Sequence, residues 1–472
     1  MISEARACCV PEARTGGSAM SQTSHAYAEA LAWTWVVADA TVGRMSDDNG
    51  KHPSIWHHRD FLLLWGGQTV SEMGSQVTVL ALPLVAVVLL EASAFQVGLL
   101  SAAETSAYLL VALPAGAIVD RVPKLRLMIW CNLALFLVIG SVPLAHAVGA
   151  LTLAQLYAVA LVSSVFSVFF SVAYQSYLPV LLDRNQLMDG NGKVAVSRSV
   201  AQIAGPSLGA GLVALIGAAG AMAADALSFA LSAGSLTAIR TRERRRPSAE
   251  ADRRPGLWAQ IREGLAYVTR DPILRNSVAF NGTANFFVIM VETLGPVFLI
   301  RTLHLRPALV GLLLALGAVG GVAGGVAARY LARKVGSARI SWISMTVLSL
   351  PGLLIPLAGH GWWVLLFGFG WISWTFASTV AGVSLTTYRQ AAGPPDMLGR
   401  VSAAARWITW GTLPLGGVVG GALATALGVQ TTLWIAVAGG CCAGLWLFFS
   451  PLRGMRDIPL GKPEPAPVGG KP

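Results

Sequence analysis

Four acidic side chains interrupt long apolar stretches of the sequence: Glu72, Glu104, Asp225 and Glu292. A charged group at the centre of a membrane-spanning helix costs about 2.5–3.5 kcal/mol, so such groups are rare and usually functional. A carboxylate in that position can bind and release a proton, or bind the charged part of a small molecule. These four residues are therefore the first candidates for chemistry in this chain.

The first apolar run places Glu72 within a polar stripe. Its polar neighbours stand three and four residues away, on the same face of a helix: Gln68, Thr69, Ser75 and Gln76. Glu72 also lies about 17 Å beyond Phe61 at 1.5 Å per residue, close to the middle of a bilayer. We expect Glu72 to carry proton coupling or substrate binding, with Gln68 and Gln76 as further contacts. The alternative is a buried acid that stabilises helix packing.

The other three acids differ in their surroundings. Glu104 lies in a similar polar stripe of its own, and Glu292 follows Asn285 on a sparser one. Both stripes are expected to line a hydrated cavity, where Asn285 is another candidate for contact with a substrate. Asp225 stands in the segment AADALSF without a polar stripe, which favours a structural hydrogen bond.

Two arginines, Arg198 and Arg406, also lie inside apolar runs. A buried guanidinium needs acceptors, so these residues can pair with the membrane acids or with an anionic substrate. The alternative is that they reach the lipid interface and anchor their helices. Four tryptophans lie inside apolar runs between residues 371 and 410: Trp371, Trp374, Trp407 and Trp410. They either line a cavity for a lipophilic substrate or face lipid.

Membrane helices are the elements that must position these residues. Hydrophobic residues make up 54% of the chain and charged residues 12%, and the mean hydropathy is +0.62, far outside the soluble range. A spanning helix needs roughly 20 apolar residues. The sequence contains twelve such runs, near 61–90, 95–119, 125–147, 151–180, 191–216, 219–239, 276–300, 307–332, 338–358, 361–387, 399–426 and 430–450. The predicted fold is an all-α integral membrane protein, for which the lipid bilayer is the solvent.

The net charge of +11 follows the membrane topology. Basic residues crowd the loops after the even-numbered runs, whereas the opposite loops hold only Arg301 and Arg306. The positive-inside rule then places both termini in the cytoplasm of a multi-pass protein of the cell membrane. Because the charges are sorted by side of the membrane, no nucleic-acid partner is expected.

An internal repeat divides the chain into two homologous six-helix halves. Gly116 has a counterpart in Gly324, and the spacing from Arg198 to Pro206 recurs from Arg406 to Pro414. The two bundles are predicted to cover residues 55–240 and 276–452. The segment between them, 241–275, is predicted to be a cytoplasmic linker with an amphipathic helix, because its apolar residues follow helical spacing. Parallel halves of this kind bind substrate between them and alternate its access to the two sides.

The two ends of the chain lack a spanning run. Residues 1–54 contain only the short apolar stretch AEALAWTWVVADA, which is too short to cross a bilayer. We expect residues 1–54 and 453–472 to be disordered tails. Met45 would be a sensible alternative start that shortens the first of them.

A charged loop follows the second apolar run. It reads GAIVDRVPKLR and contains Gly116, Asp120, Arg121, Lys124 and Arg126. In one interpretation, its charges serve as a topological anchor and have no further role. Alternatively, the acid can bind the positive N-terminal end of a neighbouring helix in one conformation only, and such a contact biases the equilibrium between inward-open and outward-open forms.

Twelve runs in two halves, together with this loop, resemble the major facilitator superfamily. The segment AGPSLGAG, with Gly205, Pro206, Gly209 and Gly211, is similar to a Gly-Pro motif associated with antiporters in that family. The segment IREGLAYVTRDPILRN resembles the branch that contains macrolide-efflux and siderophore-export proteins. The sequence departs from the family pattern at Pro123, where a glycine is frequent, and at Ala328, which replaces the acid in the second half.

These features predict a secondary transporter rather than an enzyme. The sequence has no phosphate-binding loop of the ATPase type, so protons are the expected energy source and no cofactor or metal is expected. The predicted function is proton-coupled export of amphiphilic small molecules, such as drugs, macrolides or siderophore-like metabolites, by a monomer. A scaffold or sensor that retains the fold, and a nutrient importer, are the alternatives.

Overall fold

The computed structural model describes residues 55–119, 121–182, 184–241, 257–392 and 398–458. These residues belong to one compact unit, Ile55–Pro472. The predicted tail at 1–54 and the first part of the linker lie outside the described residues. Within the described part the chain is helical and contains no strand, in agreement with the predicted all-α class.

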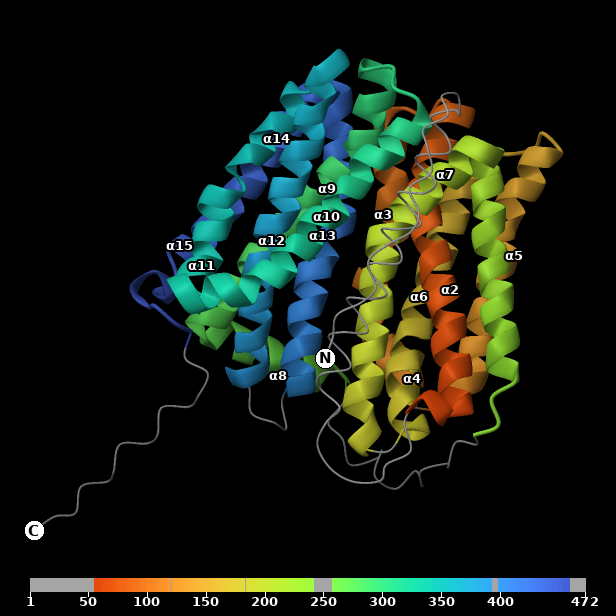
Figure 1. Cartoon of the computed structure of the whole chain (residues 1–472), viewed down its shortest axis with the longest axis horizontal. Helices are drawn as coiled ribbons and strands as arrows, with labels where there is room; N and C mark the ends of the chain where they lie inside the picture. The colour runs from red at the N-terminus through yellow and green to blue at the C-terminus, as the bar shows by residue number, and fades with distance from the viewer. Residues whose placement is uncertain (1–54, 120, 183, 242–256, 393–397, 459–472) are drawn as a thin grey trace, which may run out of the picture. The chain divides into compact units, whose positions relative to one another are not determined.

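The first half of the chain forms one group of long helices (Figure 1). They are, in chain order, η1 (Ile55–His57), α2 (Arg59–Leu84), η2 (Val85–Leu89), α3 (Ala94–Leu110), α4 (Ala112–Val119), α5 (Lys124–Ala147), α6 (Leu153–Leu181) and α7 (Arg184–Thr237). The long α7 is interrupted at Gly217, whose φ of 77° lies in the left-handed region that glycine tolerates best. The chain therefore turns within α7, where the sequence predicts the connection between its fifth and sixth runs.

The second half forms another group of helices. They are α8 (Leu257–Arg270), α9 (Pro272–Val297), η4 (Phe298–Thr302), α10 (Pro307–Val335), α11 (Ser337–Ile343), η5 (Ser344–Leu348), η6 (Leu350–Leu357), η7 (Gly361–Val364), α12 (Leu365–Ala392), α13 (Leu398–Leu427), α14 (Val429–Ala443), α15 (Leu445–Phe448) and η8 (Pro451–Gly454). The Asp271 side chain caps α9 by accepting hydrogen bonds from the backbone N–H groups of Ile273 and Leu274. For this reason α9 begins four residues before the predicted bundle boundary at 276.

Ten helices of the described part are long and apolar enough to cross a membrane. The predicted run at 95–119 is not among them, because it is divided between α3 and α4 at Val111. Pro114 explains the break, since proline has no N–H to donate to the carbonyl of Leu110. The run at 191–216 and most of the run at 219–239 lie in α7, which ends at Thr237, so the observed helices are consistent with the twelve predicted spans.

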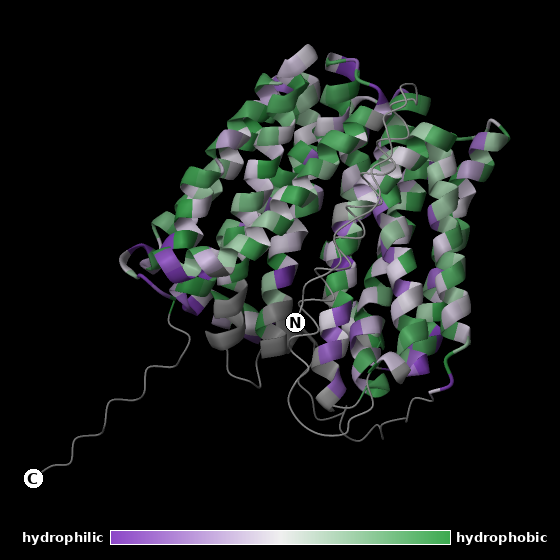
Figure 2. Ribbon diagram, viewed as in Figure 1, coloured by the Kyte–Doolittle hydropathy of each residue, from purple (hydrophilic) through white to green (hydrophobic). Residues whose placement is uncertain are grey.

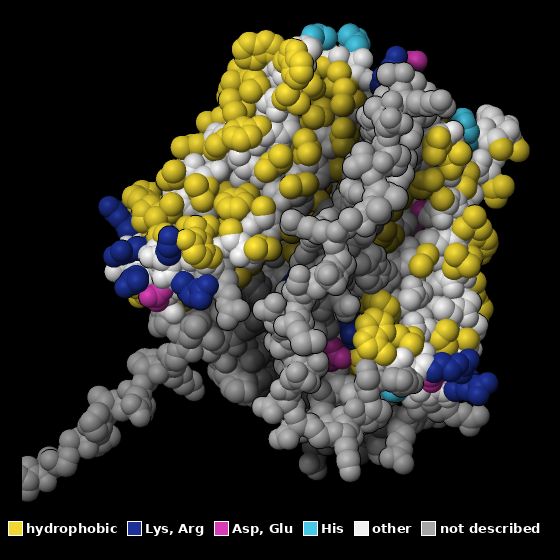
Figure 3. Space-filling model, in the orientation of Figure 1, with side chains coloured by type: hydrophobic (Ala, Val, Ile, Leu, Met, Phe, Trp, Pro, Cys, Tyr) yellow, Lys and Arg dark blue, Asp and Glu magenta, His cyan; other side chains and the backbone are white. Residues whose placement is uncertain are grey.

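Each half has its own apolar cores. In the first half they include Leu84, Leu135 and Tyr177, and in the second half Leu274, Phe298 and Phe367. The ribbons of both groups are largely hydrophobic in Figure 2, and hydrophobic side chains cover much of the described surface on the face seen in Figure 3. Lys and Arg side chains gather toward the lower edge of the view in Figure 3.

The two halves meet along α3 and α13, and along α7 and α10. A Cβ on Gly98 would lie 2.4 Å from the carbonyl oxygen of Gly417, and one on Gly311 would lie 2.4 Å from the Cβ of Ala210. The helices therefore approach each other closely only because these residues lack side chains. Gly98 lies near the start of α3, and Gly311 lies near the start of α10. Both close contacts are therefore at the end of the molecule where α2 connects to α3 and α9 connects to α10.

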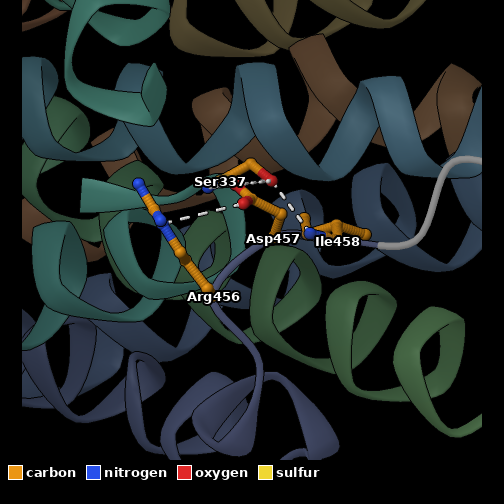
Figure 4. A network of polar contacts seen from close by, with 4 residues as sticks. All are labelled: Ser337, Arg456, Asp457 and Ile458. Atoms are coloured by element: carbon orange, nitrogen blue, oxygen red, sulfur yellow. Dashed lines mark hydrogen bonds and ion pairs between the residues drawn. The ribbon is translucent and has the colours of Figure 1, made fainter. Parts of the chain in front are cut away.

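The chain after η8 is folded against α11. The backbone N–H of Ser337 donates to the Asp457 carboxylate at 2.9 Å, and the N–H of Ile458 donates to the Ser337 hydroxyl at 2.9 Å (Figure 4). Ile458 is buried in an apolar core of the second half. The prediction of a disordered tail beginning at residue 453 is therefore wrong for residues 453–458, because these residues supply hydrogen-bond partners and an apolar anchor; residues 459–472 lie outside the described part.

Candidate functional site

A pocket in the first half contains Glu72 and Arg198. Its lining residues come from α2, α6 and the first part of α7: Trp65, Gln68, Thr69, Glu72, Tyr174, Val194, Ser197 and Arg198. The Arg198 Nε lies 3.8 Å from Glu72 Oε1, and Gln68 Nε2 donates a hydrogen bond to Glu72 Oε2 at 3.2 Å. The structure thus brings together the acid and the arginine that the sequence singles out separately.

Close packing of α2 against α7 positions this pair. A Cβ on Gly205 would lie 2.3 Å from the Cβ of Gln76, and one on Gly209 would lie 3.3 Å from the Cα of Val77. These two glycines of the antiporter-like motif therefore allow the helices to approach, with Pro206 between them. Gly211, by contrast, faces open space. Gln76 packs at this contact rather than lining the pocket.

Two buried polar atoms in the pocket lack hydrogen-bond partners among the described residues. They are the amide oxygen Oε1 of Gln68 and the hydroxyl of Tyr174. The Tyr174 side chain is only 5% exposed. Because buried polar groups are usually hydrogen-bonded, these two atoms require partners from outside the described residues, either water or a bound group.

A cluster of aromatic and basic residues adjoins the pocket. The Trp65 indole donates to the backbone oxygen of Lys193 at 3.3 Å. The Lys193 ammonium lies 4.0 Å from the ring centre of Trp56 and 3.7 Å from the Asp189 carboxylate. The N-terminal segment η1 is thereby fixed to the start of α7.

Residues of both halves meet beside the pocket. Tyr108 packs edge-on against Trp410, with ring centres 4.5 Å apart. Its hydroxyl lies within electrostatic range of Glu72, Arg198 and Arg406. The two predicted arginines therefore both lie near the contact between the halves, and both are exposed.

The tryptophans predicted to line a cavity or to face lipid do not share one environment. Trp371 and Trp374 are buried inside the second half, where the Trp371 indole donates to the backbone oxygen of Leu314. For these two residues neither interpretation is correct. Trp407 donates to the backbone oxygen of Leu109 in the other half, and Trp410 remains partly exposed beside Tyr108.

Glu104 and Glu292 lie in opposite halves and within electrostatic range of each other. One residue along from Glu292, the Thr293 hydroxyl donates to the Ser101 hydroxyl at 2.9 Å and joins α9 to α3. The Glu292 side chain is exposed in the structure. On the same helix the Asn285 amide donates to the backbone oxygen of Thr409 at 2.8 Å, so it joins α9 to α13.

Asp225 lies apart from the pocket, inside the first half. Its carboxylate accepts hydrogen bonds from the hydroxyls of Thr78 and Ser228, and the side chain is 1% exposed. The sequence favours a structural hydrogen bond for this acid, and the two hydrogen bonds that Asp225 accepts are of this type.

The charged loop is only partly described. Asp120 lies outside the described residues; Arg121 and Arg126 are exposed, and Lys124 begins α5. A side chain at Gly116 would meet open space among the described residues.

No group of three or more His, Cys, Asp or Glu residues that could hold a metal occurs in the described part of the chain. The sequence reasoning missed Trp65, Tyr174 and Ser197 as pocket residues. Tyr174 shares a face of α6 with Ser163, Ser167 and Ser171, so a polar stripe was an available signal, but periodicity alone does not reveal which helix that face meets.

Two groups of membrane-length helices, with acids and arginines at the contact between them, define the architecture of a secondary transporter. The family model of the Major Facilitator Superfamily matches residues 64–413. The chain belongs to this superfamily. It is therefore a multi-pass membrane transporter of small molecules and not an enzyme.

Several named proteins resemble the chain. The multidrug efflux pump Tap of Mycolicibacterium fortuitum is 27% identical over 385 residues, which cover 79% of this chain and 90% of Tap. The uncharacterized transporter y4rN of Sinorhizobium fredii is 25% identical over 260 residues, 53% of this chain and 60% of y4rN. Among solved structures, a bacterial homologue of the iron transporter ferroportin in an inward-facing state aligns with a TM-score of 0.66, at 17% identity over 83% of this chain and 98% of that one.

Proposed function

We propose that the protein exports amphiphilic small molecules in exchange for protons. The multidrug efflux pump Tap aligns along most of both chains. The Gly-Pro motif supports exchange because it resembles a motif associated with antiporters, and its Gly205 and Gly209 form the close contact between α2 and α7 beside the pocket. Drugs, macrolides and siderophore-like metabolites are the proposed substrates.

The Glu72–Arg198 pair is the observation that carries this proposal. Glu72 is 24% exposed and Arg198 51% exposed, so both groups can be reached from the pocket. A carboxylate that is accessible and has an exposed cationic partner can bind either a proton or a substrate. Antiport follows if the two compete for Glu72 within one opened cavity.

Alternating access requires the two halves to rearrange about this site. We assign the charged loop a state-dependent contact through Asp120, and Glu104 and Glu292 a supporting role in the cavity. The proposed orientation places both termini in the cytoplasm of the cell membrane, and one copy of the chain suffices because the pocket lies within a single subunit.

The variant Glu72→Gln tests the coupling. It keeps the size of the side chain and one acceptor but cannot ionise, so substrate can bind and exchange while proton coupling stops. The assay measures ethidium movement in proteoliposomes, first with an imposed pH gradient and then as counterflow without a gradient. The pH gradient should accelerate transport by the wild type only, and counterflow should continue in Glu72→Gln.

Glu91→Gln is the matched control, because Glu91 is an exposed acid in the α2–α3 connection. It should leave both assays unchanged. If gradient-driven transport persists in Glu72→Gln but is lost in Glu104→Gln or Glu292→Gln, proton coupling belongs to the acids between the halves and the assignment of Glu72 is wrong.

A further inference from the structure

The pocket beside Glu72 has an unusual balance of hydrogen-bonding groups. Gln68 donates its Nε2 to Glu72, which leaves the amide oxygen Oε1 as an acceptor without a partner among the described residues. The opposite amide orientation would place this oxygen against the carboxylate, so the chemistry of the pair fixes the assignment. The pocket therefore presents an amide oxygen that requires a donor.

Tyr174 provides a second group of this kind. Its hydroxyl has no partner among the described residues, lies on the pocket wall formed by α6, and belongs to a side chain that is 5% exposed. A phenol can accept as well as donate a hydrogen bond. A ligand group that donates several hydrogen bonds would therefore satisfy both Gln68 and Tyr174.

The charges of the pocket distinguish a cationic ligand from an anionic one. An anion would approach Arg198 but would leave the Gln68 oxygen without a donor and would be repelled by Glu72. A protonated amine can donate to Gln68, Tyr174 and Glu72 together. The Trp65 and Tyr174 rings add faces that attract a cation.

Arg198 does not prevent such binding. Its Nε lies 3.8 Å from Glu72 and its side chain is 51% exposed, and an ion pair of this exposure contributes about 0–1 kcal/mol. An entering ammonium can replace the guanidinium at little cost. In the empty pocket Arg198 then acts as the counter-ion that the substrate displaces.

The geometry points to this pocket as the binding site for a protonated amine, the head group of an amphiphilic substrate whose apolar part lies toward Tyr108 and Trp410. The inference rests on the proposed export function for its biological role. The binding itself can be measured without transport, so the two statements are tested separately.

The test uses three dansyl-labelled alkyl probes of equal chain length, which end in a primary amine, a trimethylammonium group or an alcohol. Dansyl fluorescence reports their binding to the purified full-length protein in lipid nanodiscs. The wild type should bind the amine most tightly and the alcohol most weakly. Gln68→Met should weaken binding of the amine roughly tenfold, as expected for a lost hydrogen bond to a charged group, and should leave the trimethylammonium probe, which has no N–H, unchanged.

Tyr174→Phe provides a second variant that changes one atom only, and it should weaken amine binding several-fold in the same selective way. Gln175→Met and Tyr177→Phe are the matched controls on α6, because neither residue lines the pocket, and both should bind all three probes as the wild type does.

Equal binding of amine and alcohol, or loss of the amine preference in the controls, would overturn the inference. So would preferential binding of a carboxylate-ended probe that depends on Arg198. If selective binding is observed but no probe is exported by proteoliposomes, the pocket is established and the export function fails. If the amine is exported and Gln68→Met and Tyr174→Phe have no effect, export stands and the pocket assignment fails.

Discussion

Asp225 is a membrane acid whose contacts lie within one bundle. Its carboxylate accepts hydrogen bonds from the Thr78 hydroxyl on α2 and from the Ser228 hydroxyl, which lies with Asp225 on α7. A second polar contact of the same interior joins the Asn132 amide to the Ser232 hydroxyl at 2.8 Å. Hydrogen bonds of this kind hold helices together in a lipid environment, so we assign Asp225 a role in folding.

Replacement of Asp225 should therefore affect stability before transport. Asp225→Ala leaves two buried hydroxyls without their acceptor, at a cost of about 1–3 kcal/mol, and should lower the melting temperature of the purified protein. Asp225→Asn retains one acceptor and should have a smaller effect. A double-mutant cycle with Thr78→Val measures the coupling between the two side chains. Normal melting of Asp225→Ala with a loss of pH-driven transport would instead place this acid in the coupling mechanism.

At the scale of single elements, the segment after η8 completes the start of α11. The first backbone N–H groups of a helix have no partner within it. Here the N–H of Ser337 donates to the Asp457 side chain, and the N–H of Ala338 donates to the backbone oxygen of Arg456 at 3.1 Å. The C-terminal segment thus acts as an N-terminal cap supplied from a distant part of the sequence (Figure 4).

Asp457→Ala should remove part of this cap, at a cost of about 0.5–2 kcal/mol. We expect the amide hydrogens at the start of α11 to exchange several times faster, while those of α5 in the other half remain unchanged. Hydrogen exchange followed by mass spectrometry measures both. Arg456→Ala is the control, because its ion pair with Asp457 is exposed at 65% and 63% and should contribute little. Equal exchange rates in the two variants would show that Asp457 does not cap the helix.

At the scale of the whole molecule, the closest contacts between the halves lie toward one end. Ala94 and Gly98 approach Gly421 and Gly417, and Gly311 approaches Ala210. Beyond Val111 the chain continues as α4, which packs against α6 in its own half. At the other end of α3 the halves also meet, but through the larger side chains of Tyr108, Leu109, Trp407 and Trp410. A close backbone approach at one end only is expected in one state of an alternating-access cycle.

Gly98→Ala should shift this state. The added Cβ would meet the backbone of Gly417 and Gly421, which cannot move aside as a flexible side chain can. Overpacking costs about 1–3 kcal/mol, which corresponds to a change of roughly fivefold or more in the ratio of two conformations. Spin labels at the exposed residues Glu91 and Thr431 should report a larger population of long distances.

Gly234→Ala is the control for this experiment, because a Cβ at Gly234 meets open space. It should leave the distance distribution unchanged. An unchanged distribution in Gly98→Ala as well would mean that the contact between α3 and α13 does not control the opening of this end.

The sequence alone determined the membrane class, singled out four acids inside apolar runs and predicted two homologous halves. Hydropathy and charge act on each segment separately, so these properties can be read along the chain. The stripe around Glu72 was likewise visible, since Gln68 and Glu72 are one helical turn apart. The sequence did not predict the ends of helices that depend on a proline or on a distant residue. Examples are the end of α3 at Val111 and the C-terminal segment that contacts α11.

Only the tertiary structure decided which side chains meet. Periodicity groups residues on one face of a helix but does not say which neighbour that face meets, and Tyr174 enters the pocket only through the way α6 packs on α2 and α7. The pairing of Glu72 with Arg198, and the proximity of Glu104 to Glu292, likewise join helices far apart in sequence. Such contacts depend on how ridges and glycine-lined surfaces of different helices fit together, a property of the assembled bundles that no single segment of sequence contains.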